Sequence, residues 1–199
     1  MESPHKLRTL LKARRQQLPD NIRYTANTQV CARVQNLAAF HRAKRIAAYL
    51  SHNGEVDIMP ILNLAHALGK QCYLPVLHPF LPQRLLWAPW HPTVAIRYNR
   101  FAIGEPIYKP NQLIKPIWLD MVLVPLVGFD QHGHRLGMGG GFYDYTFAHR
   151  RYRQHWQRPL LLGMAFNEQA CTSLDKQPWD VPMDAIITPG KIYQTTEMK

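Results

Sequence analysis

The stretch that decides the fold spans residues 45–76 and reads RIAAYLSHNGEVDIMPILNLAHALGKQCYLPV. Its first part, Arg45 to Leu50, is an apolar run typical of a buried strand, and its last part, Gln71 to Val76, is another. Between them, Asp57 is placed to cap a helix, and Gly69 stands where that helix should end. Apolar residues keep helical spacing in between: Ile58, Ile61, Leu62, Ala65 and Leu68. This succession predicts a βαβ unit and therefore a parallel sheet.

The rest of the chain adds elements of the same kind on both sides of this unit. The predicted elements are a helix with Leu7, Leu10, Leu11 and Leu18 on one face and ended by Pro19-Asp20, a helix from about Ala26 to His41, strands at Met121–Val124, Leu160–Phe166 and Ala185–Thr188, and a helix from Phe142 to about Tyr152. Basic residues, Arg15 among them, cover much of the remaining surface of the first helix.

Between residues 78 and 116 prolines interrupt the pattern, which predicts short strands and loops covering one edge of the sheet. No internal repeat or linker divides the chain. We therefore expect one α/β domain over residues 1–199, a three-layer α/β/α arrangement around a mostly parallel, Rossmann-like sheet.

The composition is that of a globular protein, with 46% hydrophobic and 19% charged residues among 199. No run of about 18 apolar residues occurs, so no transmembrane helix is expected. The three cysteines lie far apart, which argues against a disulfide framework or a cysteine-rich zinc site and fits a reducing cytosol. A cytoplasmic monomer is the expectation.

The formal net charge of +11 favours anionic partners, such as nucleotides, nucleic acid, or phosphorylated and polycarboxylate ligands. A basic, solvated surface without a specific partner explains the charge equally well. Charge alone therefore leaves the class of partner open.

The most informative chemical motif is glycine-rich, and residues 135–144 read RLGMGGGFYD. Closely spaced glycines let backbone N–H groups point into one concavity, and the N-terminus of the following helix adds partial positive charge. Arg135 adds a cation for phosphate oxygens, and Asp144 is placed to hold a hard cation such as magnesium beside them. These features favour a nucleotide triphosphate site. A tight turn is the alternative, since neither a Walker A loop nor a dinucleotide fingerprint is present.

With its neighbours, this motif resembles the signature of the 5-formyltetrahydrofolate cyclo-ligase family. The resemblance rests on residues 124–130 (VPLVGFD), Gly133 and residues 135–144. It continues through residues 48–57 (AYLSHNGEVD), residues 69–76 (GKQCYLPV) and the basic segment near the start, so it runs over nearly the whole chain in order. The glycine motif is specific, and the other segments support it.

The resemblance implies that the glycine loop and two basic residues near the N-terminus bind ATP. The matching residues are Lys6, Arg8, Arg135, Leu136, Gly137, Met138, Gly139, Gly140, Gly141, Phe142 and Tyr143. Arg135 is assigned to the charge of the transferring phosphoryl group. The family pattern has a lysine four residues before Arg8, where this chain has Pro4, and either Lys6 or His5 takes that place after a shift.

The resemblance also implies folate and magnesium contacts. Leu50, Glu55 and Tyr143 match folate contacts, and a carboxylate such as Glu55 suits a pterin, which presents an N–H beside an exocyclic amine. Asp144 and Asp180 match carboxylates at magnesium, with Asp184 as a rival for the second position. Without the resemblance, Glu55 reads as an exposed residue after a turn, and Leu50 and Tyr143 read as core residues.

The implied reaction is the ATP-dependent cyclisation of 5-formyltetrahydrofolate, with or without a polyglutamate tail. ATP phosphorylates the formyl oxygen, the 10-position nitrogen attacks the activated carbon, and phosphate leaves as the ring closes to 5,10-methenyltetrahydrofolate. No covalent nucleophile is required, only positioning and charge neutralisation. Two alternatives stay open: a basic nucleic-acid-binding protein without catalytic activity, although no recognised motif supports it, and a protein of the same fold that binds sugar phosphates or coenzyme A.

Overall fold

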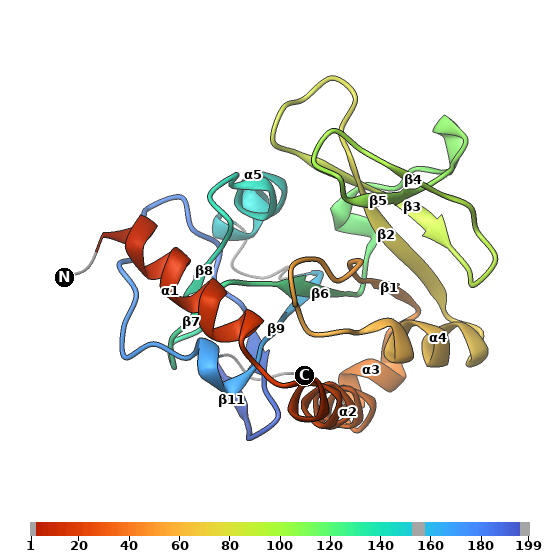
Figure 1. Cartoon of the computed structure of the whole chain (residues 1–199). Coiled ribbons are helices and arrows are strands. Elements are labelled where there is room, and N and C mark those ends of the chain that lie inside the picture. Colours follow the sequence, from red (N-terminus) through yellow and green to blue (C-terminus); the bar gives the residue numbers. More distant parts are fainter. Residues whose placement is uncertain (1–2, 153–157, 196–199) are drawn as a thin grey trace.

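The computed structural model of the chain describes residues 3–152 and 158–195. Its main feature is a seven-stranded sheet with the order β11-β10-β9-β6-β1-β2-β3 (Figure 1). The strands are β1 (Arg45–Ala47), β2 (Gln71–Leu77), β3 (Leu85–Trp90), β6 (Met121–Pro125), β9 (Leu160–Met164), β10 (Ala185–Ile187) and β11 (Ile192–Gln194). Two small two-stranded sheets stand apart from it, β4 (Ile96–Tyr98) with β5 (Gly104–Pro106), and β7 (Gly128–Phe129) with β8 (Arg135–Leu136).

The five inner strands of the large sheet are parallel, and its two edge strands are antiparallel. β1 pairs in parallel with β2 on one side and with β6 on the other, and β9 and β10 continue the parallel order. β3 and β11 close the edges in the opposite direction. The expected α/β class with a mostly parallel sheet is therefore confirmed, and the predicted βαβ unit supplies two of its neighbouring inner strands, β1 and β2.

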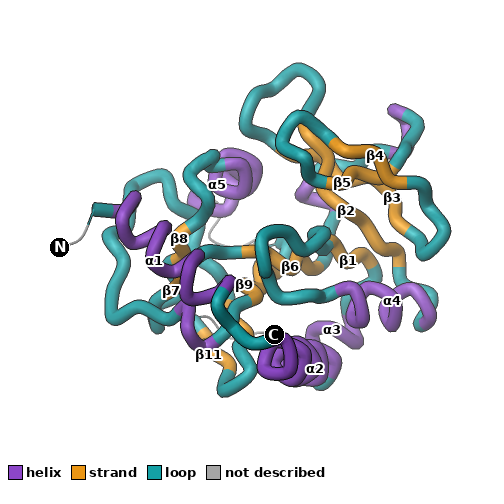
Figure 2. The backbone as a smooth tube through the Cα atoms, viewed as in Figure 1, coloured by secondary structure: helices purple, strands orange, loops and turns teal. Residues whose placement is uncertain are grey.

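Helices cover both faces of the sheet, as Figures 1 and 2 show. The helices are α1 (Pro4–Gln16), α2 (Asp20–Gln35), α3 (Ala38–Arg42), α4 (Met59–Ala67) and α5 (Phe142–Phe147), with 3-10 turns at Pro110–Gln112, Pro116–Trp118, Ala148–Arg151 and Asn167–Gln169. α2, α3 and α4 lie on one face, and α5 lies on the other. None of the helices in the described ranges is long and apolar enough to cross a membrane.

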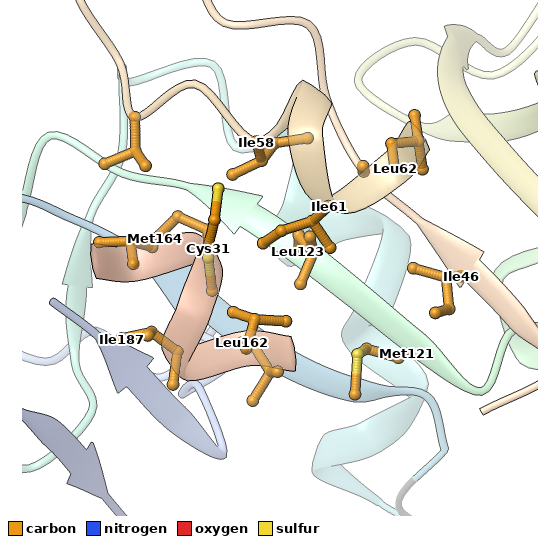
Figure 3. Packing of buried hydrophobic residues seen from close by; sticks show 14 of the residues in the cluster. Cys31, Ile46, Ile58, Ile61, Leu62, Met121, Leu123, Leu162, Met164 and Ile187 are labelled. Atoms are coloured by element: carbon orange, nitrogen blue, oxygen red, sulfur yellow. The ribbon is translucent and has the colours of Figure 1, made fainter. Parts of the chain in front are cut away.

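Two apolar clusters, one on each face, hold the layers together. Figure 3 shows the larger one, in which Cys31 of α2 and Ile61 of α4 point toward Leu123 and Leu162 of the central strands. On the opposite face, Trp87 of β3 packs against Phe147 of α5, with ring centroids 5.5 Å apart. Inner parallel strands are apolar on both faces because both faces are covered.

The βαβ unit follows its sequence signals closely. The N-cap of α4 is Ile58, one residue after the predicted Asp57, and the Asp57 carboxylate accepts a hydrogen bond of 3.0 Å from the amide of Met59, the first residue of the helix. Gly69 follows the helix with φ +73°, a left-handed conformation that favours glycine. The strand at its start is shorter than predicted, because only Arg45–Ala47 pairs regularly before the chain leaves the sheet.

The helix predicted from about Ala26 to His41 has different bounds. α2 begins at Asp20, directly after Pro19, and ends at Gln35, and a separate short helix, α3, follows. Proline is tolerated at a helix start because its missing N–H is not needed there, and an acidic residue in the first turn is favourable. Pro19-Asp20 therefore ends one helix and begins the next.

The helix predicted from Phe142 to about Tyr152 is also shorter. Only six residues, Phe142–Phe147, are α-helical, and a 3-10 turn over Ala148–Arg151 continues them. The segment between residues 78 and 116 does cover one edge of the sheet, as expected, and β3 within it pairs with β2 from Cys72↔Trp90 to Leu77↔Leu85.

We predict that Leu123→Ala lowers the free energy of unfolding by about 2–5 kcal/mol, because the substitution leaves a cavity between the central strand and α4. Leu123 is fully buried in β6 (0% exposed). Leu68→Ala is the matched control, since Leu68 is 54% exposed at the end of α4 and should change stability by about 0.5 kcal/mol or less. Urea unfolding followed by circular dichroism measures both, and equal losses would contradict the assignment of the core.

Candidate functional site

A cavity of about 1020 Å³ opens at the carboxyl ends of the parallel strands. From β1, the chain adds β2 on one side and later β6, β9 and β10 on the other, so the direction of strand addition reverses between β1 and β6. Open α/β sheets bind their ligands at such a switch point. Tyr49 and Leu50 after β1, and Pro125 and Leu126 at the end of β6, line the cavity there.

The remaining walls come from segments far apart in the sequence. They are the start of α1 (Pro4, Leu7, Arg8), the turn after β1 (His52, Asn53, Glu55), the β2–β3 region (Pro75, Leu77, Gln83, Leu85), the β4–β5 hairpin (Asn99, Phe101, Ile103, Gly104, Glu105), residues 135–145, Arg151, and a loop (Ser173, Leu174, Asp175, Gln177, Trp179, Asp180). The predicted glycine loop, Leu50, Glu55 and Asp180 thus share one cavity, although up to 130 residues of sequence separate them.

The glycine loop joins β8 to α5 and takes conformations that require glycine. Gly139 has φ +99° and Gly141, directly before α5, has φ +68°. Residues other than glycine rarely adopt such φ angles. The Arg8 Nε donates a hydrogen bond of 2.9 Å to the Gly137 carbonyl, which ties α1 to the loop. Because α5 is only six residues long, the charge expected from its N-terminus is small, and the side chains Arg8 and Arg135 carry the positive charge of this wall.

Arg135 and Asp144 form an ion pair on the cavity wall. The Arg135 Nη2 lies 2.7 Å from the Asp144 Oδ1, and the two side chains are only 7% and 16% exposed. The same Oδ1 accepts a hydrogen bond of 3.1 Å from the Val181 amide. The Arg135 Nε is buried and makes no hydrogen bond within the described residues. The guanidinium thus retains hydrogen-bonding capacity for a further acceptor.

Glu55 lines the same cavity as this pair. Its side chain is 12% exposed, and its nearest cation is Arg15, with Nη1 3.8 Å from Oε1. Its Oε2 accepts a hydrogen bond of 3.1 Å from the His52 amide. Burial raises the pKa of Glu55 from 4.5 to about 7, while Arg15 and the His52 amide partly oppose the rise. The carboxylate is therefore short of hydrogen-bond donors, a condition that a ligand with adjacent N–H groups would satisfy.

Leu50 and Tyr143 lie on the wall between these two charged sites. The Leu50 side chain reaches β5, where a Cβ added to Gly104 would come within 2.8 Å of its Cδ1. The Tyr143 ring stacks on Phe147 with centroids 6.2 Å apart, and the Arg135 guanidinium lies 5.8 Å from its centre. Burial raises the pKa of the Tyr143 hydroxyl, so it stays protonated at neutral pH.

The three acidic residues considered for magnesium differ in their surroundings. Asp144 and Asp180 line the cavity, and Asp180 Oδ2 accepts a hydrogen bond of 2.9 Å from the Gln177 amide. Asp184 is buried, pairs with Arg150 at 2.6 Å, accepts from the Leu161 amide, and does not line the cavity. No cluster of three or more His, Cys, Asp or Glu side chains suited to a metal occurs among the described residues. A magnesium ion here would depend on one or two carboxylates and on ligand oxygens, as it does in many nucleotide sites.

Sequence reasoning missed several residues of the cavity and placed one elsewhere. Lys6 is exposed and is not among the residues that line the cavity. Arg15, expected on the outer surface of its helix, is instead 1% exposed and faces Glu55. Phe101 and Glu105 come from the proline-interrupted segment, where no periodic pattern marked them. In the sequence, the one feature that marked Arg15 is its place in the adjacent pair Arg14-Arg15 of the basic segment near the N-terminus.

The fold and the cavity define an α/β protein with a ligand site at a topological switch point, lined by a glycine loop and by paired charges. The model of the 5-formyltetrahydrofolate cyclo-ligase family matches residues 1–189. The 5-formyltetrahydrofolate cyclo-ligase of Escherichia coli K12 is 35% identical over 187 residues, 93% of this chain and 100% of the relative. The chain therefore belongs to the 5-formyltetrahydrofolate cyclo-ligase family, a family of ligases.

Two further relatives agree with this assignment. The 5-formyltetrahydrofolate cyclo-ligase of Haemophilus influenzae is 35% identical over 183 residues, covering 91% of this chain and 95% of the relative. The NMR structure of 5,10-methenyltetrahydrofolate synthetase from Aquifex aeolicus matches with a TM-score of 0.82 at 25% identity, over 100% of this chain and 95% of that one. The resemblance seen in the sequence is thus confirmed at the level of the family.

The raised pKa of Glu55 implies that the free energy of unfolding depends on pH. The folded protein holds this proton more tightly than the unfolded chain, so the carboxyl contributes stability below its ordinary pKa of 4.5 that is lost as the pH rises through about 7. Glu55→Gln cannot ionise, and we predict that it is more stable than the wild type at pH 8 by on the order of 3 kcal/mol. Most of the difference should disappear at pH 5.

Urea unfolding at pH 5 and pH 8 measures this effect. Glu168→Gln, which changes an exposed glutamate, is the matched control and should shift stability equally at both values. A Glu55→Gln protein with no gain at pH 8 over pH 5 would show that Glu55 is not held in a desolvated site.

Proposed function

We propose that this protein converts 5-formyltetrahydrofolate to 5,10-methenyltetrahydrofolate with the consumption of ATP. The observation that carries the proposal is one cavity lined both by the glycine loop beside Arg135 and by the largely buried carboxylate of Glu55. ATP transfers its terminal phosphoryl group to the formyl oxygen. The 10-position nitrogen then bonds to the formyl carbon and releases its proton to solvent, and the carbon–oxygen bond breaks as phosphate leaves.

The ATP phosphates belong, on this proposal, at the glycine loop between residues 135 and 143. Arg8 and Arg135 supply fixed positive charge there, and Arg135 is nearly buried, so its interaction with a phosphate is weakly screened by water. Gly139 and Gly141 carry no side chains of their own, which favours a close approach of a phosphate to their backbone N–H groups. Lys6 stays a prediction from the sequence, because its side chain lies outside the cavity wall.

The pterin of the folate belongs at Glu55, with Leu50 and Tyr143 as apolar contacts. A carboxylate accepts two parallel hydrogen bonds from the pterin N–H and its exocyclic amine. Binding these donors favours the ionised form of Glu55, which burial otherwise disfavours. The ligand therefore relieves an unfavourable feature of the empty cavity, and this relief contributes to affinity and to the orientation of the ring.

Asp144 and Asp180 are the residues that would hold magnesium. Both lie on the cavity wall, and Asp144 Oδ2 makes no hydrogen bond among the described residues, so a hard cation has an oxygen available. Bound there, the ion would neutralise phosphate charge. Arg135 acts alongside it by stabilising charge on the transferring phosphoryl oxygens, and no side chain is asked to form a covalent intermediate.

A single domain acting as a cytoplasmic monomer, and acceptance of polyglutamylated folates, also stay predictions from the sequence. The alternative of a nucleic-acid-binding protein gains no support from the family match. A steep loss of RNA affinity with salt, in a protein that forms no methenyltetrahydrofolate, is the result that would favour that alternative.

The absorbance of methenyltetrahydrofolate tests the reaction directly. We predict product from purified protein, ATP, magnesium and 5-formyltetrahydrofolate, and none when ATP is omitted. Excess chelator should abolish turnover, and added magnesium should restore it. Absence of product under the complete conditions contradicts the proposed reaction, whereas full turnover in chelator contradicts only the role given to Asp144 and Asp180.

We predict that Arg135→Met weakens ATP binding about ten- to a hundredfold, because a charge-assisted hydrogen bond is worth about 1.5–3 kcal/mol. Arg158→Met is the matched control. It also breaks an arginine–aspartate pair, with Asp120 at 3.1 Å, but at the amino end of β6, away from the cavity. Calorimetric titration with ATP measures both proteins. Equal affinities in two folded variants would make Arg135 a structural residue.

A further inference from the structure

Arg15 is a buried cation that the reaction as proposed does not use. Its side chain is 1% exposed, although it belongs to a helix whose other basic residues face outward or half outward. Its Nη1 donates to the Leu126 carbonyl at 3.2 Å, and its Nη2 donates to the Asn53 carbonyl at 2.9 Å. Leu126 and Asn53 belong to the two segments that leave β6 and β1 at the switch point. One guanidinium thus joins α1 to both sides of the crevice.

The turn that carries Glu55 depends on these arginine contacts. Asn53 and Gly54 are both left-handed, with φ +51° and +74°. The Asn53 carbonyl is held by Arg15, and the Gly54 carbonyl is held by Arg23 at 2.9 Å. Arg23 also donates to the Arg15 carbonyl at 2.9 Å, so the two arginines form one assembly beneath the turn. The position of the Glu55 backbone is therefore set from α1 and α2.

The same guanidinium also sets the charge of Glu55. Arg15 is its only salt-bridge partner among the residues that the structure describes, at 3.8 Å, a distance too long for a hydrogen bond but short for a buried charge pair. The other titratable groups facing Glu55 are the hydroxyls of Tyr49 and Tyr143, while His52 of the same turn lines the same cavity. The Tyr49 hydroxyl donates to the Val56 carbonyl at 2.8 Å and stays protonated.

We propose that Arg15 is a positioning residue that holds Glu55 in place and in its ionised form, so that this carboxylate can bind the pterin. Arg15 does so without contacting the substrate, because its hydrogen bonds to the two carbonyls keep it beneath the turn. The inference rests on the proposed function for its consequence in folate binding. Its physical core, the coupling between the two side chains, holds for the empty protein and is measurable there.

The coupling predicts a change in pKa. Burial already brings the pKa of Glu55 to about 7, with Arg15 lowering it. An opposite charge within 4–6 Å typically shifts a pKa by about 1–3 units, so a neutral side chain at position 15 should raise the pKa of Glu55 by roughly that amount. At pH 7 the ionised fraction would then fall from about one half to roughly a tenth or a hundredth for shifts of about 1 or 2 units.

The test compares Arg15→Gln with Arg14→Gln, the same change at the neighbouring, exposed arginine of α1. Gln keeps a donor for the carbonyls but removes the charge. In Arg15→Gln, 5-formyltetrahydrofolate affinity at pH 7 should fall roughly five- to fiftyfold and recover toward the wild-type value by pH 9, with ATP affinity unchanged. Arg14→Gln should keep the wild-type affinities and pH profile. A loss of folate affinity that is equal at every pH, or no loss, overturns the proposal.

Carbon-13 NMR titration of the Glu55 carboxyl, assigned with Glu55→Gln, gives a readout that needs no ligand. A pKa raised by a unit or more in Arg15→Gln supports the coupling, and an unchanged pKa overturns it. This measurement separates the inference from the proposed function, because a wild-type protein that binds no folate refutes the function while the titration still decides the coupling.

If Arg15→Gln does not fold, Arg15→Lys carries the test. A lysine retains the charge but not the planar fork, so the midpoint of folate affinity against pH should stay within about half a unit of the wild-type value. A midpoint displaced upward by a unit or more with the charge retained would overturn the role of that charge.

Discussion

The parallel pairing of β1 with both β2 and β6 is the constraint on which the rest of the structure depends. Because β1 is the first strand of the chain and an inner strand of the sheet, later strands are added on both sides of it, and the connections that leave β1 and β6 diverge. Side chains at the end of β1 and at the end of β6 therefore face each other across a crevice. The crevice receives the glycine loop from one direction and the β4–β5 hairpin from another, so the site follows from the strand order.

Charges buried along this crevice are unfavourable in the empty protein. Glu55 is desolvated, with a cation 3.8 Å away, and Arg135 has a buried Nε without a hydrogen-bond partner in the described chain. A protein tolerates such groups where a ligand supplies what is missing. Glu55 lacks hydrogen-bond donors and Arg135 lacks an acceptor. A ligand of this cavity must therefore supply N–H donors near Glu55 and an anionic acceptor near Arg135. A pterin and a polyphosphate meet these demands, and an apolar ligand meets neither.

The sequence predicted the elements whose signals are local and missed the features that depend on distant partners. Gly69 marked the end of α4, and Asp57 marked its start to within one residue, because turn hydrogen bonds and left-handed glycine act over a few residues. The start of α2 at Asp20 was missed because Pro19 was read only as the end of α1, and β11 was missed because a three-residue edge strand has too short a pattern. The family was identified from the glycine motif, whereas the burial of Arg15 could not be, since it depends on carbonyls of residues 53 and 126. The contacts of Lys6, Asp144 and Asp180 with ligands stay predictions.

The two ion pairs of the cavity differ in a way that separates their roles. The Arg135–Asp144 pair lies on the wall, where a phosphate can compete for the guanidinium and a cation for the carboxylate, so that each charge exchanges its partner for one of the same sign. Arg15 cannot make such an exchange, because it is 1% exposed and bound to two backbone carbonyls. Its field therefore persists whether or not a ligand is bound. On the proposed function, the Arg135–Asp144 pair separates to accept ATP and magnesium, whereas the Arg15–Glu55 pair stays intact behind the pterin. Glu55 can then accept hydrogen bonds from the pterin while Arg15 still balances its charge.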